Sequence, residues 1–158
     1  MNLKTQTDYA LRTLLYLAFV NEKATADQIA DAYGISKDHL VKVIQQLAKY
    51  GYVRSQSGRT GGVKLARPAA LINVADVVAD FEGRAGVLGC VTDPTFCCLE
   101  PGCSLRSQLI RAEKAFFDVL RESTIADMLK SAGPLAVASP PAGGLYNLTV
   151  RPRGGSAT

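Results

Sequence analysis

The most reactive side chains of this chain belong to its four cysteines, which lie within fourteen residues in the segment GCVTDPTFCCLEPGCS. Clustered thiols in a protein of the reducing cytoplasm favour metal or redox chemistry over structural disulfides. Zinc sites usually pair their cysteines as C-x2-C, a spacing that is absent, and the sole histidine, His39, lies in a different predicted element. A reversible dithiol switch remains open, because neighbouring thiols such as Cys97 and Cys98 can oxidise.

An iron–sulfur cluster is the third candidate for the cysteine segment. Gly89, Gly102 and two prolines give the segment the freedom to wrap its sulfurs around a cluster. Taking Cys90, Cys97 and Cys103 as ligands leaves one iron in need of a ligand other than a thiolate. An oxygen ligand would bind that iron more weakly than sulfur and leave it open to exchange by a small molecule. This arrangement is more typical of a sensor than of an electron carrier.

The composition is that of one compact globular domain, or of two small ones that share a dimer, with 158 residues, 47% hydrophobic and 20% charged. The longest apolar stretch, Leu14–Val20, is far shorter than the ~20 residues of a membrane span. The polar segment Met1–Asp8 is unlike a signal peptide. We therefore expect a small cytoplasmic protein that does not contact a membrane. No Ser/His/Asp set, phosphate-binding loop or cofactor-binding glycine pattern is evident, which argues against an enzyme.

Positive charge is concentrated in the N-terminal half of the chain. Residues 1–68 carry ten Lys/Arg and five Asp/Glu, whereas residues 69–131 carry six Lys/Arg and nine Asp/Glu. A basic half on a chain of net charge +4 favours a polyanionic partner for that half alone. Random scatter in a short chain would produce the same asymmetry, so the charge is only supporting evidence.

The N-terminal half begins with two predicted helices. Helical periodicity predicts a first helix over residues 5–20, with Thr5 or Thr7 available as its N-cap. A capping box at Thr25 predicts a second helix, which we expect to end near Gly34, where glycine can adopt a left-handed conformation.

A third helix and a hairpin complete the pattern of a winged helix. Ser36 is expected to cap a helix that runs up to Gly51, and two short helices joined by a glycine-containing turn form a helix-turn-helix. Any two core helices would give the same pattern. Residues 52–54 and 63–67 are then predicted to form a β-hairpin around the glycine-rich turn 57–62.

The start of the third helix and the tip of the hairpin carry the predicted DNA contacts. In such folds the first turns of the recognition helix meet base edges, and the wing meets phosphates or the minor groove. A solvated helix face is the alternative explanation for each polar side chain taken alone. The predicted DNA-binding residues are Ser36, Lys37, His39, Lys42, Arg59, Thr60 and Gly61.

The remaining chain is predicted to contain three further helices and a tail. A helix over 71–82 is expected to pack on the first, and a long helix begins at Ser104. Its apolar residues follow the a/d spacing of a coiled-coil seam, which indicates a dimerisation helix; a core helix of a monomer is the alternative. A short helix over Thr124–Lys130 comes last, and the tail 132–158, with nine Pro or Gly, is expected to be disordered. The seam residues are Leu105, Leu109, Ala112, Phe116 and Val119.

Taken in order, these segments resemble the NsrR family, nitric-oxide-sensing repressors within a larger family of winged-helix regulators that also contains IscR. The resemblance covers about residues 1–131. It rests on MNLKTQTDYALRTLLYLA, YGISKDHLVKVIQQLAKYGYV, GRTGGVKLARP, the loop C-x6-C-x5-C and STIADML. IscR carries a ligating histidine three residues after its third cysteine, where this chain has Arg106.

The resemblance implies a homodimer with a winged helix in each subunit and an iron–sulfur cluster bound near the dimer interface, with 4Fe–4S expected and 2Fe–2S open. Asp8 would ligate from the partner subunit, although a carboxylate near a helix start more often serves the helix dipole. Arg12, one turn later, would hold the charged cluster or its loop, and Cys98 is an extra thiol that could replace Cys97. The implied ligands are Cys90, Cys97, Cys103 and Asp8.

We therefore expect a mainly α fold with a small β wing, in which a winged helix-turn-helix domain is followed by a long dimerisation helix. The implied function is a repressor that binds a palindromic double-stranded DNA operator and leaves it when nitric oxide nitrosylates the cluster. The alternative is an iron–sulfur or thiol redox-sensing regulator of the same family, in cluster-biogenesis or oxidative-stress control. The expected parts are residues 1–82 (DNA binding), 83–103 (cluster loop), 104–131 (dimerisation helix and last helix) and 132–158 (tail).

Overall fold

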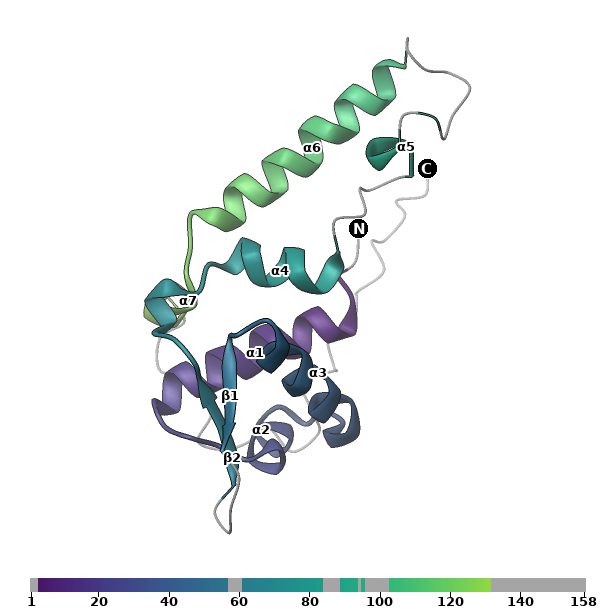
Figure 1. Ribbon diagram of the computed structural model, residues 1–158. Coiled ribbons are helices and arrows are strands. Elements are labelled where there is room, and N and C mark those ends of the chain that lie inside the picture. Colours follow the sequence, from purple (N-terminus) through teal and green to yellow (C-terminus); the bar gives the residue numbers. More distant parts are fainter. Residues whose placement is uncertain (1–2, 57–60, 84–88, 94, 96–102, 132–158) are drawn as a thin grey trace, which may run out of the picture.

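Three helices and a hairpin lie at one end of the computed structural model, and a long helix leads away from them (Figure 1). The structure describes residues 3–56, 61–83, 89–93, 95 and 103–131. The predictions for Arg59, Thr60, Cys97, Cys98 and the tail therefore lie outside the described residues. None of the described helices is both long and apolar enough to cross a membrane.

The first three helices are α1 (Thr5–Val20), α2 (Ala26–Tyr33) and α3 (Lys37–Lys49), close to the predicted bounds. The capping box at Thr25 is confirmed: its hydroxyl accepts from the Gln28 backbone N–H at 3.2 Å, and the Gln28 side chain accepts from the Thr25 N–H at 2.8 Å. Gly34 ends α2 with a φ of 62°, and Ser36 caps α3.

The expected N-cap of α1 is wrong. Lys4 occupies that position, and its side chain makes no capping hydrogen bond. Thr7 is instead fully buried within the helix, and its hydroxyl donates to the Glu82 carboxylate at the end of a later helix. Glu82 also accepts from the Lys4 backbone N–H at 2.7 Å. The Thr7 hydroxyl, which the local sequence suggested as a helix cap, therefore makes a tertiary hydrogen bond to Glu82 instead.

The hairpin consists of β1 (Val53–Gln56) and β2 (Gly62–Leu65), paired antiparallel with Val53 opposite Leu65. The loop between α1 and α2 joins this sheet at Ala24, whose backbone exchanges hydrogen bonds of 2.9 and 2.8 Å with Val63. A Cβ atom at Gly62 would lie 2.9 Å from the Ala24 carbonyl oxygen, so this close approach requires glycine.

After the hairpin, the 3-10 helix η1 (Ala69–Leu71) leads into α4 (Val74–Glu82). The helix starts three residues later than the predicted 71–82, because the Asn73 side chain caps it by accepting from the Ala75 N–H at 2.9 Å. As predicted, α4 packs on α1. The Glu82 contacts with Lys4 and Thr7 fix the end of α4 to the start of α1.

The last part of the chain holds α5 (Gly89–Thr92), α6 (Ser104–Arg121) and α7 (Ile125–Ser131). The sequence-based loop over 83–103 missed the single turn of α5. The turn between α6 and α7 pairs with the start of α4, since the Val74 N–H donates to Ser123 at 3.1 Å and the Ile125 N–H donates to Ile72 at 2.9 Å. Ile125 is fully buried, so α7 anchors the long helix to the N-terminal core.

The core surrounds α1, and its largest fully buried side chains come from every part of the winged-helix unit. They include Leu14, Leu17, Ile29, Leu40, Leu47, Tyr52, Ile72 and Ile125. The mainly α fold with one small two-stranded sheet agrees with the prediction.

The predicted seam of α6 divides between two directions. Phe116 packs on the core of its own chain together with Phe117 and Leu120. In contrast, Leu105 is 61% and Val119 63% exposed, and Ala112 between them is exposed as well. These three residues repeat every seven positions and form an uncovered apolar row on α6.

Candidate nucleic-acid interface and metal site

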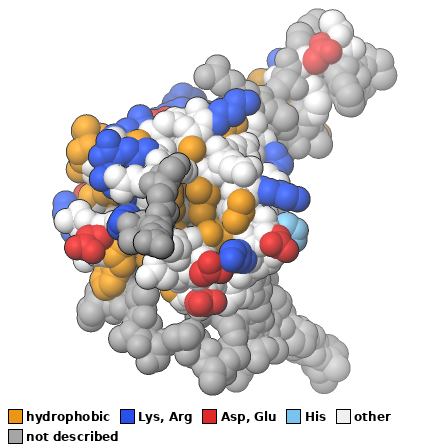
Figure 2. All heavy atoms as spheres, turned by 60° about the horizontal axis from the view of Figure 1, so that its bottom comes forward, with side chains coloured by type: hydrophobic (Ala, Val, Ile, Leu, Met, Phe, Trp, Pro, Cys, Tyr) orange, Lys and Arg blue, Asp and Glu red, His pale blue; other side chains and the backbone are white. Residues whose placement is uncertain are grey.

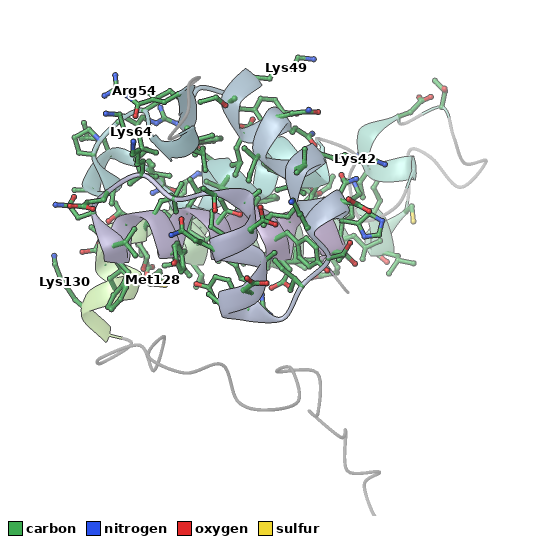
Figure 3. The ribbon with its side chains drawn as sticks, turned by 90° about the horizontal axis from the view of Figure 1, so that it is seen from below. Lys42, Lys49, Arg54, Lys64, Met128 and Lys130 are labelled. Atoms are coloured by element: carbon green, nitrogen blue, oxygen red, sulfur yellow. The ribbon has the colours of Figure 1, made fainter. Side chains whose placement is uncertain are left out.

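The outward face of α3 is a polar stripe. Leu40, Val43, Ile44 and Leu47 face the core, so residues 38, 42, 45 and 49 lie on the opposite side of the helix. All four are exposed: Asp38, Lys42, Gln45 and Lys49. Figure 3, seen from below, shows Lys42 and Lys49 along this helix. Asp38 and Gln45 were not among the predicted contacts, although their spacing from the apolar positions would have placed them on this face.

Lys37, a predicted DNA contact, is held on the side of α2. Its ammonium nitrogen lies 2.6 Å from an Asp27 carboxylate oxygen, and both side chains are more than half exposed. The hydrogen bond to Asp27, together with its charge, raises the pKa of Lys37. Exposed ion pairs contribute little to stability, so a DNA phosphate can compete for this ammonium group.

The predicted contact His39 faces α1 rather than the outward stripe. With Lys42, Thr5 and Gln6 it lines a pocket of about 230 Å³ between the start of α1 and the first turns of α3. Ser36 is occupied as the N-cap, accepting from the His39 backbone N–H at 3.5 Å. The structure therefore brings Lys42 and His39 together.

The hairpin presents two cations, Arg54 and Lys64, that were not among the predicted DNA contacts. Arg54 lies directly opposite Lys64 in the strand register. Neither forms an ion pair with another residue in the described part of the chain, and Figure 3 shows them close together. Like charges at opposed positions destabilise a hairpin unless an anion lies between them. The strand alternation on either side of the turn would have revealed this pair, had the register been known.

Basic side chains gather on one part of the face formed by α3 and the hairpin. Figure 2 shows Lys and Arg along the upper part of this face, with acidic side chains mainly below them. Gly61, the one predicted tip residue that the structure describes, is half-buried directly before β2. A polyanion would therefore bind across the end of the molecule formed by α3 and the hairpin.

The base of the hairpin is fixed to α4 by a buried tyrosine. The Tyr52 hydroxyl donates to Asp80 at 2.6 Å, and the guanidinium carbon of Arg67 lies 4.6 Å from the centre of the Tyr52 ring. Burial, followed by the hydrogen bond to Asp80, raises the pKa of Tyr52, so this hydroxyl stays protonated at neutral pH. These contacts hold the hairpin rigidly against α4.

At the opposite end of the molecule, two cysteine-bearing segments lie together. Cys103 directly precedes α6, and its thiol is free and half-buried. Cys90 lies in α5, which packs against α6 (Figure 1). Among the described residues no three potential ligands converge on one point, but Cys97, Cys98 and the side chain of Cys90 are not among them.

The chemistry of these donors fits an iron–sulfur cluster. Thiolates are the usual ligands of such clusters, and Cys103 makes no capping hydrogen bond that would compete for its sulfur. The segment from 83 to 103 contains no histidine, so thiolates and carboxylates are its only strong metal donors.

Asp8 and Arg12, one turn apart on α1, form the ion pair that their spacing suggests. The Arg12 Nε donates to both carboxylate oxygens of Asp8, at 2.8 and 2.9 Å, and the Asp8 side chain is 40% exposed. The Arg12 guanidinium also lies 5.6 Å from the centre of the Tyr33 ring on α2. Burial raises the pKa of Tyr33, and Arg12 opposes this only in part. Tyr33, which sequence reasoning missed, thus links this pair to the helix-turn-helix.

The comparisons with known proteins agree with this arrangement. A family model described as "Rrf2: Iron-dependent Transcriptional regulator" matches residues 3–131. The structure of CymR (YrzC), the global cysteine regulator of B. subtilis, aligns with a TM-score of 0.70 and 23% identity, covering 83% of this chain and 98% of that one. T. potens IscR aligns with a TM-score of 0.69 and 28% identity over 84% and 88% of the two chains. Staphylococcus aureus CymR aligns with a TM-score of 0.65 and 26% identity, covering 80% of this chain and 97% of that one.

Proposed function

The chain belongs to the Rrf2 family of transcriptional regulators, and we propose that it is a cytoplasmic DNA-binding repressor that senses nitric oxide through an iron–sulfur cluster. The opposed pair Arg54 and Lys64 on the hairpin, together with the exposed Lys42 and Lys49 of α3, carries the DNA-binding part of this proposal. A DNA phosphate backbone would supply anions for these four cations, none of which forms an ion pair within the described part of the chain.

Two copies of the chain are needed to read a palindromic operator. The apolar row of Leu105, Ala112 and Val119 on α6 is the surface that we assign to the second copy, because it is exposed and repeats every seven residues. Pairing along α6 would place a recognition helix at each end of the dimer. The two-fold axis of the protein would then match that of the operator.

The sensing part of the proposal rests on Cys103 and the α5 segment that packs beside the start of α6. Cys90, Cys97 and Cys103 would hold the cluster together with the partner subunit's Asp8. A cluster held there would supply irons at which nitric oxide can react. The chain contributes the thiolates, and Arg12 orients the carboxylate of Asp8 through its two hydrogen bonds. Release of that carboxylate would loosen the connection between subunits and change the spacing of the two α3 helices.

A thiol switch without a cluster is the second candidate function. One similar structure is described as a global cysteine regulator, and another as Staphylococcus aureus CymR in an oxidized form. Free Cys103 and the adjacent pair Cys97–Cys98 provide thiols for such a switch here. In this candidate the same α6 helix would respond to a disulfide or sulfenic acid rather than to a cluster.

Anaerobic purification distinguishes the two candidates. The full chain, with Cys103→Ser and Cys98→Ser as matched variants, is analysed for visible absorbance, iron and sulfide before and after nitric oxide. We expect about four irons and four sulfides per wild-type chain, bleaching by nitric oxide, loss of the cluster in Cys103→Ser and its retention in Cys98→Ser. Protein that stays colourless and iron-free after reconstitution would contradict the cluster and leave the thiol switch.

A further inference from the structure

We propose that Asp38 is a specificity residue of α3 that selects a cytosine in each half of the operator. The inference rests on the proposed DNA binding and states which base one position of the recognition helix reads. Asp38 is an exposed carboxylate on the outward stripe of α3. Its negative charge would be repelled by the DNA phosphates near which we expect this helix to bind.

The position of Asp38 makes an encounter with bases unavoidable if α3 enters the groove. It lies in the first turn of α3, on the same stripe as Lys42 and Gln45 and opposite the buried Leu40 and Val43. Recognition helices present their N-terminal residues to base edges. Lys37 is turned toward α2 and His39 toward α1, so Asp38 is the first-turn side chain on the central stripe.

No direct contact among the described residues accounts for this carboxylate, whose charge acts on Lys37 only at longer range. Its side chain forms no hydrogen bond or ion pair within 4.0 Å in the part of the chain that the structure describes. Ser36 already caps α3, and Asp27 rather than Asp38 pairs with Lys37. An acidic residue in the first turn interacts favourably with the helix dipole. An acidic residue at position 37, to the side of the stripe, would stabilise the helix in the same way.

The chemistry of the major groove then determines what Asp38 can bind. An ionised carboxylate only accepts hydrogen bonds. Guanine presents two acceptors, N7 and O6, and thymine presents O4, so both would repel it. Adenine offers its amino group beside the N7 acceptor, whereas cytosine offers its amino group without such a neighbour. Cytosine is therefore the base edge that best offsets the cost of bringing a carboxylate into DNA.

The neighbouring residues sharpen this selection. Lys42, one turn further along the stripe, supplies the cation that holds α3 to the DNA. Asp38 lowers the attraction to every sequence in which its carboxylate finds no donor. It therefore acts mainly by rejecting wrong sequences, which is a common way to gain specificity.

Selection from randomised DNA tests the proposal. Full-length wild type, Asp38→Ala and Asp38→Asn are each allowed to bind a pool of random duplexes, and the bound sequences are read. Asp31→Ala, which removes an exposed carboxylate from α2, is the matched control. We expect wild type and Asp31→Ala to enrich a symmetric motif with one cytosine per half-site that Asp38→Ala no longer selects. In Asp38→Asn that position should change to adenine, because asparagine pairs with adenine N6 and N7.

Direct titration gives the size of the effect. Replacing the selected cytosine should weaken wild-type binding roughly tenfold and leave Asp38→Ala nearly unchanged, while Asp38→Ala binds unrelated DNA more tightly than wild type. Identical motifs for wild type and both Asp38 variants would overturn the assignment while leaving the DNA-binding proposal intact. Failure of wild type to enrich any sequence would overturn the proposed function and this inference together.

Discussion

Arg12 holds the carboxylate of Asp8 through both oxygens and lies over the ring of Tyr33, so Arg12 and Tyr33 connect this proposed metal ligand to α2. The pair is partly exposed and therefore contributes little to folding. Its geometry instead keeps the carboxylate in one orientation. If Asp8 ligates a cluster across the dimer, a change in its position would be transmitted to the helix-turn-helix through Arg12 and Tyr33.

Asp8→Ala tests this residue. We expect the free energy of unfolding of the variant to lie within about 1 kcal/mol of that of wild type, because the lost ion pair is on the surface. In contrast, it should retain less iron after anaerobic purification, and the remaining cluster should no longer alter DNA affinity. Asp31→Ala serves as the control for removing an exposed carboxylate. Unchanged iron content and unchanged regulation in Asp8→Ala would remove Asp8 from the ligand set.

Single residues were predictable where the signal was local. The Thr25–Gln28 capping box depends on a neighbour three positions away, and it was predicted and is present. The Asp8–Arg12 ion pair is equally local, four positions apart, but Arg12 was predicted to hold the cluster or its loop rather than Asp8. The role of Thr7 and the opposition of Arg54 to Lys64 depend on tertiary contact and strand register. No spacing along the chain carries that information.

Among the elements, the last helix depends on a small polar network at its start. The Asp127 carboxylate accepts from the Thr124 hydroxyl at 2.6 Å and from the Thr124 N–H at 3.1 Å, and it pairs with Lys130 at 3.1 Å. These contacts, the Thr124 hydroxyl first, lower the pKa of Asp127 from 3.8 to about 2. Because α7 inserts Ile125 into the core, the network helps to hold α6 in place.

The acid sensitivity of α7 follows from that pKa. A carboxylate whose pKa is lower in the folded state stabilises the fold above its unfolded pKa, and this contribution is lost as the pH falls. Asp127→Asn keeps the shape without the charge. The variant should have a lower melting temperature than wild type at pH 7. This difference in melting temperature should shrink as the pH falls from about 4 to about 2. An equal difference in melting temperature at pH 7 and pH 2 would contradict the assignment.

The bounds of the helices were easier to predict than the surfaces against which the helices pack. The bounds of α1, α2, α3 and α6 follow from periodicity and caps that lie within each segment. The stripe of α6 was predicted as one seam, but the body of the molecule covers Phe116 and leaves Leu105 and Val119 exposed. Which side of a helix faces its own chain depends on how α7 and α4 hold it, and periodicity alone cannot determine that.

At the scale of the whole molecule, a continuous set of contacts joins the cysteine end to α3 and the hairpin, the proposed DNA-binding end. The Asn73 side chain donates to the Arg121 carbonyl at 2.8 Å and so fixes the end of α6 to the start of α4. Glu82 then fixes the end of α4 to α1, and Asp80 holds the hairpin through Tyr52. A shift of α6 relative to its partner would therefore move the recognition helix and the hairpin as one body.

The exposed row on α6 predicts how the dimer is held. Replacing both Leu105 and Val119 by Glu should leave the chain folded, because both side chains are more than 60% exposed in the single subunit. The same change should convert dimer to monomer in sedimentation and weaken binding to a palindromic operator at least tenfold. Ser107→Glu, on another face of α6, is the charge control. A variant that remains dimeric would place the interface elsewhere.

The central claim is that the chemical state of the cysteine end sets the DNA affinity of the far end. Operator titration by fluorescence anisotropy, with anaerobically purified full-length protein before and after stoichiometric nitric oxide, tests it most directly. We expect the affinity to fall at least tenfold, a change of about 1.4 kcal/mol, and Cys103→Ser to show no response. Equal affinity before and after nitric oxide, in protein shown to carry its cluster, would contradict the claim.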